Sequence, residues 1–255
     1  MPILTSTSRL MKRAALLLDM LSIPGGMEAL LRWRPRSLVS FRIVSVLKRE
    51  CESFKTIVDG GANVGQFARA VSWAFPEAAI HCFEPQPEIA ERLRANLQDN
   101  PRLSVHECAL GNADGTTTFH RNYLSQTSSI LPLRLAHGLY GERLKQVSTI
   151  QVPIRRLDDA LRNVPWQRPA LLKLDLQGFE LEALRGAEDL LARIDFILVE
   201  AAFQEVYQGE PLFNDIHAFL ASRRFSLVRP ISFGQEPNGD ILHTDALFKR
   251  SAETQ

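Results

Sequence analysis

Short apolar runs of strand length alternate along this chain with segments whose apolar residues recur at helical spacing. The runs are "KTIVD", "AIHCFE", "LSVHECAL", "ALLKLDL" and "DFILVEA". Continuous apolar runs of this length are typical of strands buried on both faces, and the intervening helices then cover both faces of a parallel sheet. The alternation therefore predicts an α/β fold with a mostly parallel sheet.

The connecting segments show which helices to expect. Apolar residues within 67–75 recur at i, i+3, i+4, i+7 and i+8, and Pro76 ends the pattern. The same spacing predicts helices over about 88–99 and about 179–193. Near the C-terminal end, "FSLVRPISF" and "ILHTDALFKR" are separated by the turn "GQEPNGD", which predicts two more strands. These elements predict a seven-stranded sheet with an antiparallel C-terminal strand.

A glycine-rich turn follows the first predicted strand, in "TIVDGGANVGQF". Glycines allow positive φ and leave room for a ligand on the backbone where the next helix begins. Glu84 ends the second strand about 20 residues later, where an acid can bind a ribose diol. A dinucleotide fingerprint is incomplete because Ala62 replaces its second glycine. The pattern predicts a nucleoside-bearing cofactor; the alternative is a tight turn, with Glu84 beside a helix N-cap.

Several motifs, in this order, resemble the FkbM family of S-adenosylmethionine-dependent methyltransferases. They are "DGGANVGQF", "FEPQP", "ALGNADGTTTF", "TSSIL", "RRLDD" and "LLKLDLQGFELEALRGAEDLL", and the resemblance covers roughly residues 54–250. It implies the Rossmann-like class I methyltransferase fold and methyl transfer to a hydroxyl of a sugar, glycan or related natural product. The cofactor-binding positions that it implies are Asp59, Gly60, Gly61, Ala62, Asn63, Gly65, Glu84, Pro85, Cys108, Ala109 and Leu110.

Methyl transfer requires an aligned acceptor oxygen and a group that takes its proton. Period-two alternation places Lys173 and Asp175 on one strand face, with Asp175 at the cofactor end. Asp175 is the first candidate base, although it would serve equally to orient the cofactor or cap a helix. Glu200 ends the next strand and is the second candidate. Lys173 either holds an anionic group or pairs with one of these acids.

One position departs from the family pattern, Lys-x-Asp-x-Glu-Gly-x-Glu. The chain has Gln177 in place of the first glutamate. Glutamine keeps the hydrogen-bonding shape of glutamate but cannot take a proton. The departure leaves open a non-catalytic cofactor-binding module as an alternative to the enzyme. An NAD-dependent oxidoreductase on the same fold is the other alternative.

Charge is unevenly distributed along the 255 residues. Residues 1–50 carry nine Lys and Arg against three acidic residues, which predicts a basic, helical N-terminal extension. This extension either contacts an anionic membrane surface or glycan, or is a solvated helix packed on the main domain. Residues 51–255 are predicted to form the methyltransferase domain. An insertion at about 120–150 contains the hydroxyl-rich "SQTSSIL", which suits a polyol or is ordinary loop polarity.

Composition excludes several other functions. Cys51, Cys82 and Cys108 are far apart and no histidines show metal-ligand spacing, so neither a disulfide framework nor a metal site is predicted, and a reducing cytosol is expected. Without a basic groove that interleaves with aromatic residues, nucleic acid is not expected as the substrate.

Overall fold

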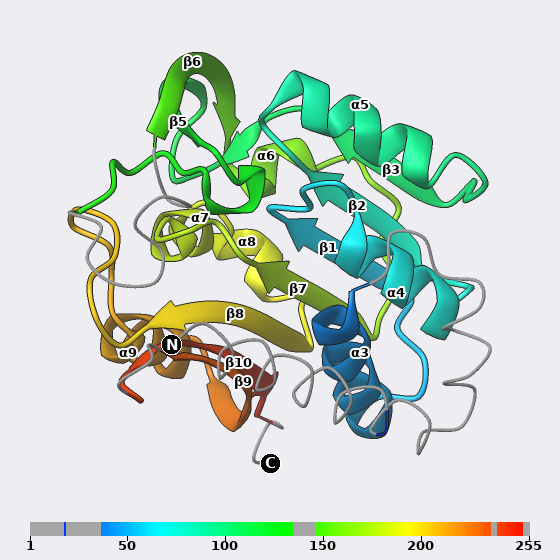
Figure 1. Ribbon diagram of the computed structural model, residues 1–255. Coiled ribbons are helices and arrows are strands. Elements are labelled where there is room, and N and C mark those ends of the chain that lie inside the picture. The colour runs from blue at the N-terminus through cyan, green and yellow to red at the C-terminus, as the bar shows by residue number, and fades with distance from the viewer. Residues whose placement is uncertain (1–17, 19–36, 135–145, 236–238, 252–255) are drawn as a thin grey trace.

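The computed structural model describes residues 18, 37–134, 146–235 and 239–251. Its framework is a seven-stranded sheet with the order β3-β2-β1-β7-β8-β10-β9 (Figure 1). Neighbouring strands from β3 to β8 are parallel, and β10 runs antiparallel to both β8 and β9. This arrangement confirms the predicted class I methyltransferase fold. The strands are β1 (Thr56–Gly60), β2 (Ala79–Phe83), β3 (Leu103–His106), β7 (Ala170–Leu174), β8 (Phe196–Ala202), β9 (Phe225–Gln235) and β10 (Ile241–Arg250).

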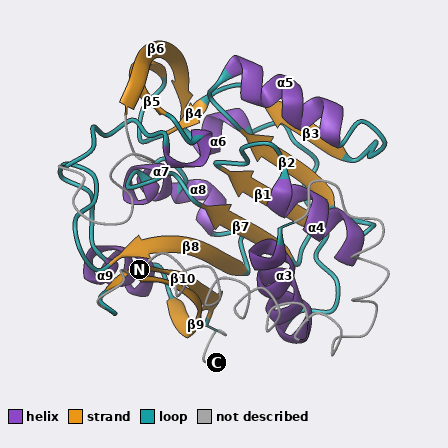
Figure 2. Cartoon of the chain, in the orientation of Figure 1, coloured by secondary structure: helices purple, strands orange, loops and turns teal. Residues whose placement is uncertain are grey.

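Helices cover both faces of this sheet, and each face has its own hydrophobic core (Figure 2). The first core is formed with α3 (Leu38–Glu50), α4 (Gln66–Ala74) and α5 (Pro87–Asn96). The second is formed with α6 (Leu157–Ala160), α7 (Glu180–Arg185), α8 (Glu188–Leu191) and α9 (Phe213–Ser222). The helices predicted at 67–75 and 88–99 correspond to α4 and α5. The helix predicted at 179–193 is instead two short helices, interrupted where Gly186 packs against the carbonyl of Gly111.

Part of the basic N-terminal segment belongs to the core. The α3 helix begins after Ser37, whose Oγ accepts a hydrogen bond from the Ser40 backbone N–H at 3.2 Å. Its buried face contributes Phe41, Val44 and Leu47 to the first core. The predictions for residues 1–17 and 19–36 lie outside the described residues. Within the described part of the chain, no helix is both long enough and apolar enough to cross a membrane.

A second, three-stranded sheet stands beside the C-terminal end of β3. It consists of β4 (Ala109–Leu110), β6 (Gln146–Arg155) and β5 (Gly115–Asn122), in that order. The segment "GTTTFHR" lies in β5, whereas the predicted strand "LSVHECAL" is divided between the two sheets. β6, which pairs antiparallel with β5, was not predicted from the sequence. Of the predicted insertion, residues 135–145 lie outside the described residues.

Candidate active site

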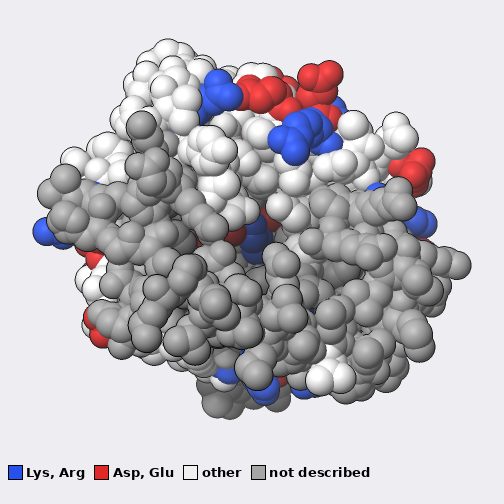
Figure 3. Space-filling view, viewed as in Figure 1, with Lys and Arg blue, Asp and Glu red and all other residues white. Residues whose placement is uncertain are grey.

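A cavity of about 490 Å³ opens at the C-terminal ends of the central parallel strands. One wall includes Ser37 and Ser40 of α3, and the opposite wall includes the short 3₁₀ helix η1 (Ser125–Thr127). In the space-filling view, acidic and basic side chains are visible recessed near the centre of this face (Figure 3). Such a location, at the strand ends of an open α/β sheet, is where this fold binds ligands.

The polar character of the cavity arises where the central strands change from apolar to ionisable residues on one face of the sheet. On the face that packs against α3 and α4, the central strands carry buried apolar residues, which are Ile57, Leu171, Leu198 and Leu247. On each of these strands, the residue two positions nearer the cavity on the same face is ionisable. These residues are Asp59, Lys173, Glu200 and Asp245. Because side chains on one face recur every second residue, the strands present this charged row directly below the cavity.

Lys173 anchors the glycine turn from below. Its Nζ lies 3.0 Å from Asp59 Oδ1 and donates to the carbonyl oxygens of Gly60 and Gly61 at 3.2 and 3.3 Å. Asp175 Oδ2 is farther away, at 3.7 Å. Burial by itself lowers the pKa of Lys173, but the surrounding carboxylates, Asp59 first, raise it above its usual value. The lysine is therefore charged and is directed at the turn.

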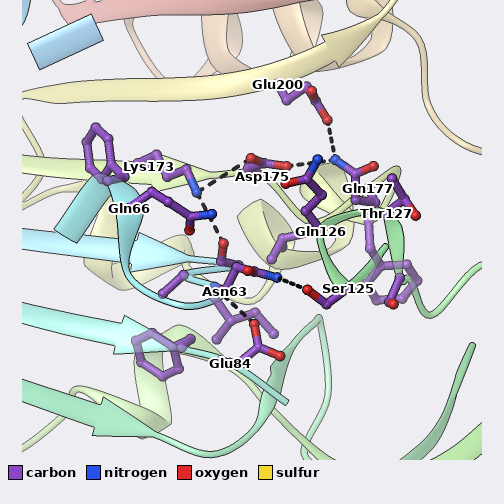
Figure 4. Close-up of a pocket in the computed structure, with 18 of the residues that line it drawn as sticks. Asn63, Gln66, Glu84, Ser125, Gln126, Thr127, Lys173, Asp175, Gln177 and Glu200 are labelled. Carbon is purple, nitrogen blue, oxygen red and sulfur yellow. Dashed lines mark hydrogen bonds and ion pairs between the residues drawn. The ribbon is translucent and has the colours of Figure 1, made fainter. Parts of the chain in front are cut away.

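The turn has the shape that its glycines suggested. Gly61 has φ +73°, and a Cβ there would lie 1.9 Å from the carbonyl oxygen of Asp175. Gly65 has φ +89° and is the N-cap residue of α4. Between them, Asn63 has φ +47° and its Nδ2 donates to Ser125 Oγ at 3.0 Å (Figure 4). The turn is thus tied both to the strand below it and to the η1 segment opposite.

Glu84 lies at the floor of the cavity beside this turn. It is 3% exposed, and its two carboxylate oxygens accept backbone N–H groups from Asn63 and Gln86, each at 3.0 Å. Burial raises the pKa of Glu84 to about 7, although these hydrogen bonds oppose the shift. The Gln86 side chain also donates to Glu84, from Nε2 to Oε1 at 3.4 Å. An ionised carboxylate has about four acceptor positions, so one, on Oε2, remains for a ligand hydroxyl, and a second opens on Oε1 where the Gln86 side chain turns aside. Gln86 is the N-cap residue of α5 and donates its backbone N–H to Glu84, so Glu84 does lie beside a helix N-cap while its carboxylate also lines the cavity.

The remaining wall on this side is largely apolar. Cys108, Ala109 and Leu110 line it together with Phe83 and Phe119. These side chains are buried, and they come from β2, from the second sheet and, for Cys108, from the link between β3 and β4. A flat apolar ring system fits such a wall, whereas a charged group would lose its hydration there.

Asp175 and Glu200 meet at the other end of the cavity, where Gln177 joins them. The Nε2 atom of Gln177 donates to Asp175 Oδ1 at 2.8 Å and to Glu200 Oε2 at 2.7 Å (Figure 4). The Oε1 atom of Gln177 accepts a hydrogen bond from the Tyr207 hydroxyl at 2.8 Å. Burial and the neighbouring acids, Asp175 first, raise the pKa of Glu200 well above its usual value. Two carboxylates with different environments therefore face one end of the cavity.

Most of the predicted site residues are brought together by the fold. Those lining the cavity are Gly61, Ala62, Asn63, Glu84, Pro85, Cys108, Ala109, Leu110, Lys173, Asp175 and Glu200. Asp59, Gly60 and Gly65 shape the turn from behind without appearing in the lining.

Other lining residues were missed from the sequence. Asp245 and His243 come from β10, and His243 Nδ1 lies 3.4 Å from Glu200 Oε1. The period-two spacing of His243 and Asp245 was visible in the sequence. The register of β10 against β8, which pairs Asp245 with Glu200, could not be predicted from it. No sequence signal indicated Tyr207. Within the described part of the chain, no three potential metal ligands are grouped to hold an ion.

Comparison with known proteins gives a family. A model described as the methyltransferase FkbM domain matches residues 59–227. The chain is 30% identical to the 2-O-methyltransferase NoeI of Sinorhizobium fredii over 207 residues, which cover 79% of this chain and 82% of that protein. It is 24% identical to the 31-O-demethyl-FK506 methyltransferase FkbM of Streptomyces tacrolimicus, covering 68% of this chain and 73% of that one.

A third relative and one solved structure complete the comparison. The hexuronic acid methyltransferase AglP of Haloferax volcanii is 25% identical, covering 66% of this chain and 65% of that protein. A crystal structure of a putative O-methyltransferase from Klebsiella pneumoniae aligns with a TM-score of 0.49 at 13% identity, covering 93% of this chain and 90% of that one. The family match includes the glycine turn, the acids Asp59 and Glu84 on the cofactor side, and the region from Lys173 to Glu200. The chain belongs to the FkbM family of S-adenosylmethionine-dependent methyltransferases.

Proposed function

We propose that this protein transfers a methyl group from S-adenosylmethionine to a hydroxyl oxygen of a sugar, glycan or related natural product. The printed names of three relatives describe a 2-O-methyltransferase, a hexuronic acid methyltransferase and a methyltransferase of 31-O-demethyl-FK506. The observation that carries the proposal is the division of one cavity into two ends. Glu84 lies at one end and Glu200, with Asp175, at the other, and the glycine turn lies between them (Figure 4).

The first end fits the adenosyl part of the cofactor. Glu84 keeps an acceptor position on Oε2 for one ribose hydroxyl, and the second hydroxyl would replace the long contact from Gln86 Nε2 at Oε1. The apolar wall at Cys108–Leu110 suits the adenine ring. The close approach of Gly61 to Asp175 leaves the turn backbone bare for the methionine part. When bound, the cofactor supplies an electrophilic methyl carbon on a sulfonium.

The second end fits the tasks that remain for the protein. An acceptor hydroxyl must lie in line with the methyl carbon and must lose its proton. Asp175 is our first candidate for holding that proton, because its carboxylate lines the cavity and is 38% exposed at the side chain. Glu200 is the second candidate, since its raised pKa strengthens it as a base. Lys173 acts on the turn rather than on the acceptor, in this assignment.

The test is transfer of a labelled methyl group from S-adenosylmethionine to a panel of sugars, lipid-linked glycans and polyketides. Binding of S-adenosylhomocysteine, measured first by isothermal titration calorimetry, establishes that the purified protein is competent. Asp175→Asn is expected to lower the transfer rate at least about 100-fold while changing the Kd for S-adenosylhomocysteine less than about threefold. Absence of binding at millimolar concentration would overturn the proposal.

The same assay separates the alternatives that the sequence left open. Binding of a nicotinamide dinucleotide instead of S-adenosylhomocysteine would support the oxidoreductase. Tight cofactor binding with no transfer to any acceptor class would support the non-catalytic module. A cytosolic location and peripheral membrane contact by residues 1–50 remain predictions, and the free thiols of Cys51, Cys82 and Cys108 accord with a reducing compartment.

A further inference from the structure

The side-chain amide of Gln177 lies between carboxylates that belong to neighbouring strands. Asp175 follows β7 and Glu200 lies in β8. The Nε2 atom of Gln177 donates one N–H to each of these carboxylates. The amide nitrogen carries only these two hydrogens, so both are used. A single neutral group thereby holds two acids within reach of one cavity.

The orientation of the amide is determined by what surrounds it. If the amide were reversed, its carbonyl oxygen would face the oxygens of Asp175 and Glu200, with no hydrogen between them. On the opposite side, the Tyr207 hydroxyl lies 2.8 Å from both Gln177 Oε1 and the Thr127 carbonyl oxygen, so these two acceptors share its one hydrogen. Tyr207 is 4% exposed, so its hydroxyl is held in place by packing. Both N–H groups of the Gln177 amide therefore have a carboxylate acceptor, and the amide oxygen faces the Tyr207 hydroxyl.

The backbone at this position is unusual and is supported on both sides. Gln177 has φ +56°, a left-handed conformation that a residue with a side chain adopts at a cost. Ser129 Oγ donates to the Gln177 carbonyl oxygen at 2.7 Å. The buried Glu180 carboxylate accepts the backbone N–H groups of Leu176 and Gly178 at 2.6 and 3.0 Å. These bonds fix the loop that aims the amide at the two acids.

We propose that Gln177 is a positioning residue that holds Asp175 and Glu200 side by side as proton acceptors at the acceptor end of the cavity. The inference rests on the proposed function, because the two acids serve proton removal only in that case. Both carboxylates lie within 2.8 Å of the same nitrogen, so without that donor two acceptors of like charge would face each other. The amide supplies that donor without adding charge.

Several titratable groups face this cluster and enter its pH dependence. They are Asp59 on β1, Lys173 on β7, His243 and Asp245 on β10, Glu180 on α7, and Tyr207 and Glu210 in the segment before α9. Lys173 is the cation that favours ionisation of the acids, and the carboxylates oppose it. A comparison of variants that differ only at the amide keeps all these groups constant.

The test uses Gln177→Glu in the free protein, with thermal unfolding measured between pH 5 and pH 8. The new carboxylate would stand against two others and must keep a proton in the folded state, whereas the unfolded chain releases it near pH 4.3. Stability of the variant relative to wild type should therefore fall as pH rises. We expect a Tm deficit about 5–10 °C larger at pH 8 than at pH 5. Gln151→Glu, an exposed site on β6, is the charge-matched control and should follow wild type.

Parallel profiles for Gln177→Glu and wild type would overturn the inference. Should Gln177→Glu fold poorly at every pH, the double variant Asp175→Asn, Gln177→Glu decides the matter. In the double variant, the amide introduced by Asp175→Asn faces the carboxylate introduced by Gln177→Glu. The double variant should therefore regain most of the Tm that Gln177→Glu loses at pH 8. Failure to regain it counts against the inference as well. Because no cofactor or acceptor is present, either result is independent of whether methyl transfer is found.

Discussion

Asp59 and Lys173 are cross-strand partners in the β1–β7 pair, and Lys173 Nζ lies 3.0 Å from Asp59 Oδ1. Both residues are buried, at 0% and 7% exposure. The pair stands where β1 and β7 change from apolar to ionisable residues, next to Gly60 and Gly61, whereas β8 and β10 change two residues farther on, at Glu200 and Asp245. The same lysine thus compensates a buried acid and holds the carbonyls of the cofactor turn.

Removing the cation from this pair should strongly destabilise the fold. Lys173→Met keeps the volume of the side chain but leaves Asp59 buried without a counter-charge, which we expect to lower the free energy of unfolding by about 3–5 kcal/mol. Urea denaturation monitored by circular dichroism measures it. The matched control is Arg94→Met, which breaks the exposed pair with Glu107 and should cost less than about 1 kcal/mol. Equal losses in the two variants would contradict a special role for the buried pair.

Much of this site followed from sequence periodicity. Alternation in "ALLKLDL" indicated that Lys173 and Asp175 share a face, and parallel strands bring their C-terminal ends to one edge. Hence Asp59, Glu84, Asp175 and Glu200 were expected near one another before any coordinates. The resemblance to a family then supplied the cofactor. These signals lie within short segments of the sequence, so the site residues could be predicted from them.

The parts that could not be predicted depend on contacts between distant segments. His243 and Asp245 reach the cavity through the antiparallel register of β10 against β8, which no single run of residues encodes. Gln177 looked like the loss of an acid, but its role depends on the positive φ at that residue and on Tyr207, thirty positions away. Likewise, the break between α7 and α8 arises from packing of Gly186 on Gly111.

Three glycine-to-alanine variants separate backbone strain from steric clash. Gly61 combines φ +73° with a Cβ position 1.9 Å from the Asp175 carbonyl oxygen, Gly209 has the same φ with open space, and Gly115 has neither constraint. We expect Gly115→Ala to be nearly neutral and Gly209→Ala to cost about 1 kcal/mol. Gly61→Ala should cost about 3 kcal/mol or more, because the backbone must also move.

Thermal and chemical unfolding of the three variants would establish the order. Calorimetry should also show weaker binding of S-adenosylhomocysteine for Gly61→Ala, at least about tenfold, and unchanged binding for the other two. An equal cost at Gly61 and Gly209 would mean that the close approach to Asp175 relaxes without penalty. The turn would then be less rigid than its contacts indicate.

Acid should destabilise the protein through a buried histidine pair at the other edge of the sheet. His81 is 7% exposed, and its Nδ1 atom lies 3.4 Å from His106 Nε2. The ring of His106 stacks on Phe83. Burial first, and then His106, lower the pKa of His81 to about 4. A group with a lowered folded pKa stabilises fully above its unfolded pKa of about 6.5, and loses that contribution as pH falls toward 4.

For His81 this loss amounts to about 2–3 kcal/mol between pH 6.5 and pH 4. His81→Gln should remove the titration, so its free energy of unfolding should fall less steeply over this window than that of wild type. His120→Gln, at a half-exposed position on β5, is the control and should keep the wild-type slope. Identical slopes for wild type and His81→Gln would show that the buried ring is hydrated enough to protonate freely.

Cofactor affinity should depend on the ionisation of Glu84. Burial raises the pKa of this carboxyl to about 7, so the fraction able to accept two ribose hydroxyls declines as pH falls through that value. The Kd for S-adenosylhomocysteine should then be about tenfold higher at pH 6 than at pH 8. Glu84→Gln should bind at least about tenfold more weakly at pH 8 and show a flat profile, because its amide does not titrate. Glu107→Gln, an exposed acid, should keep the wild-type dependence. A wild-type profile retained by Glu84→Gln would place the ribose elsewhere in the cavity.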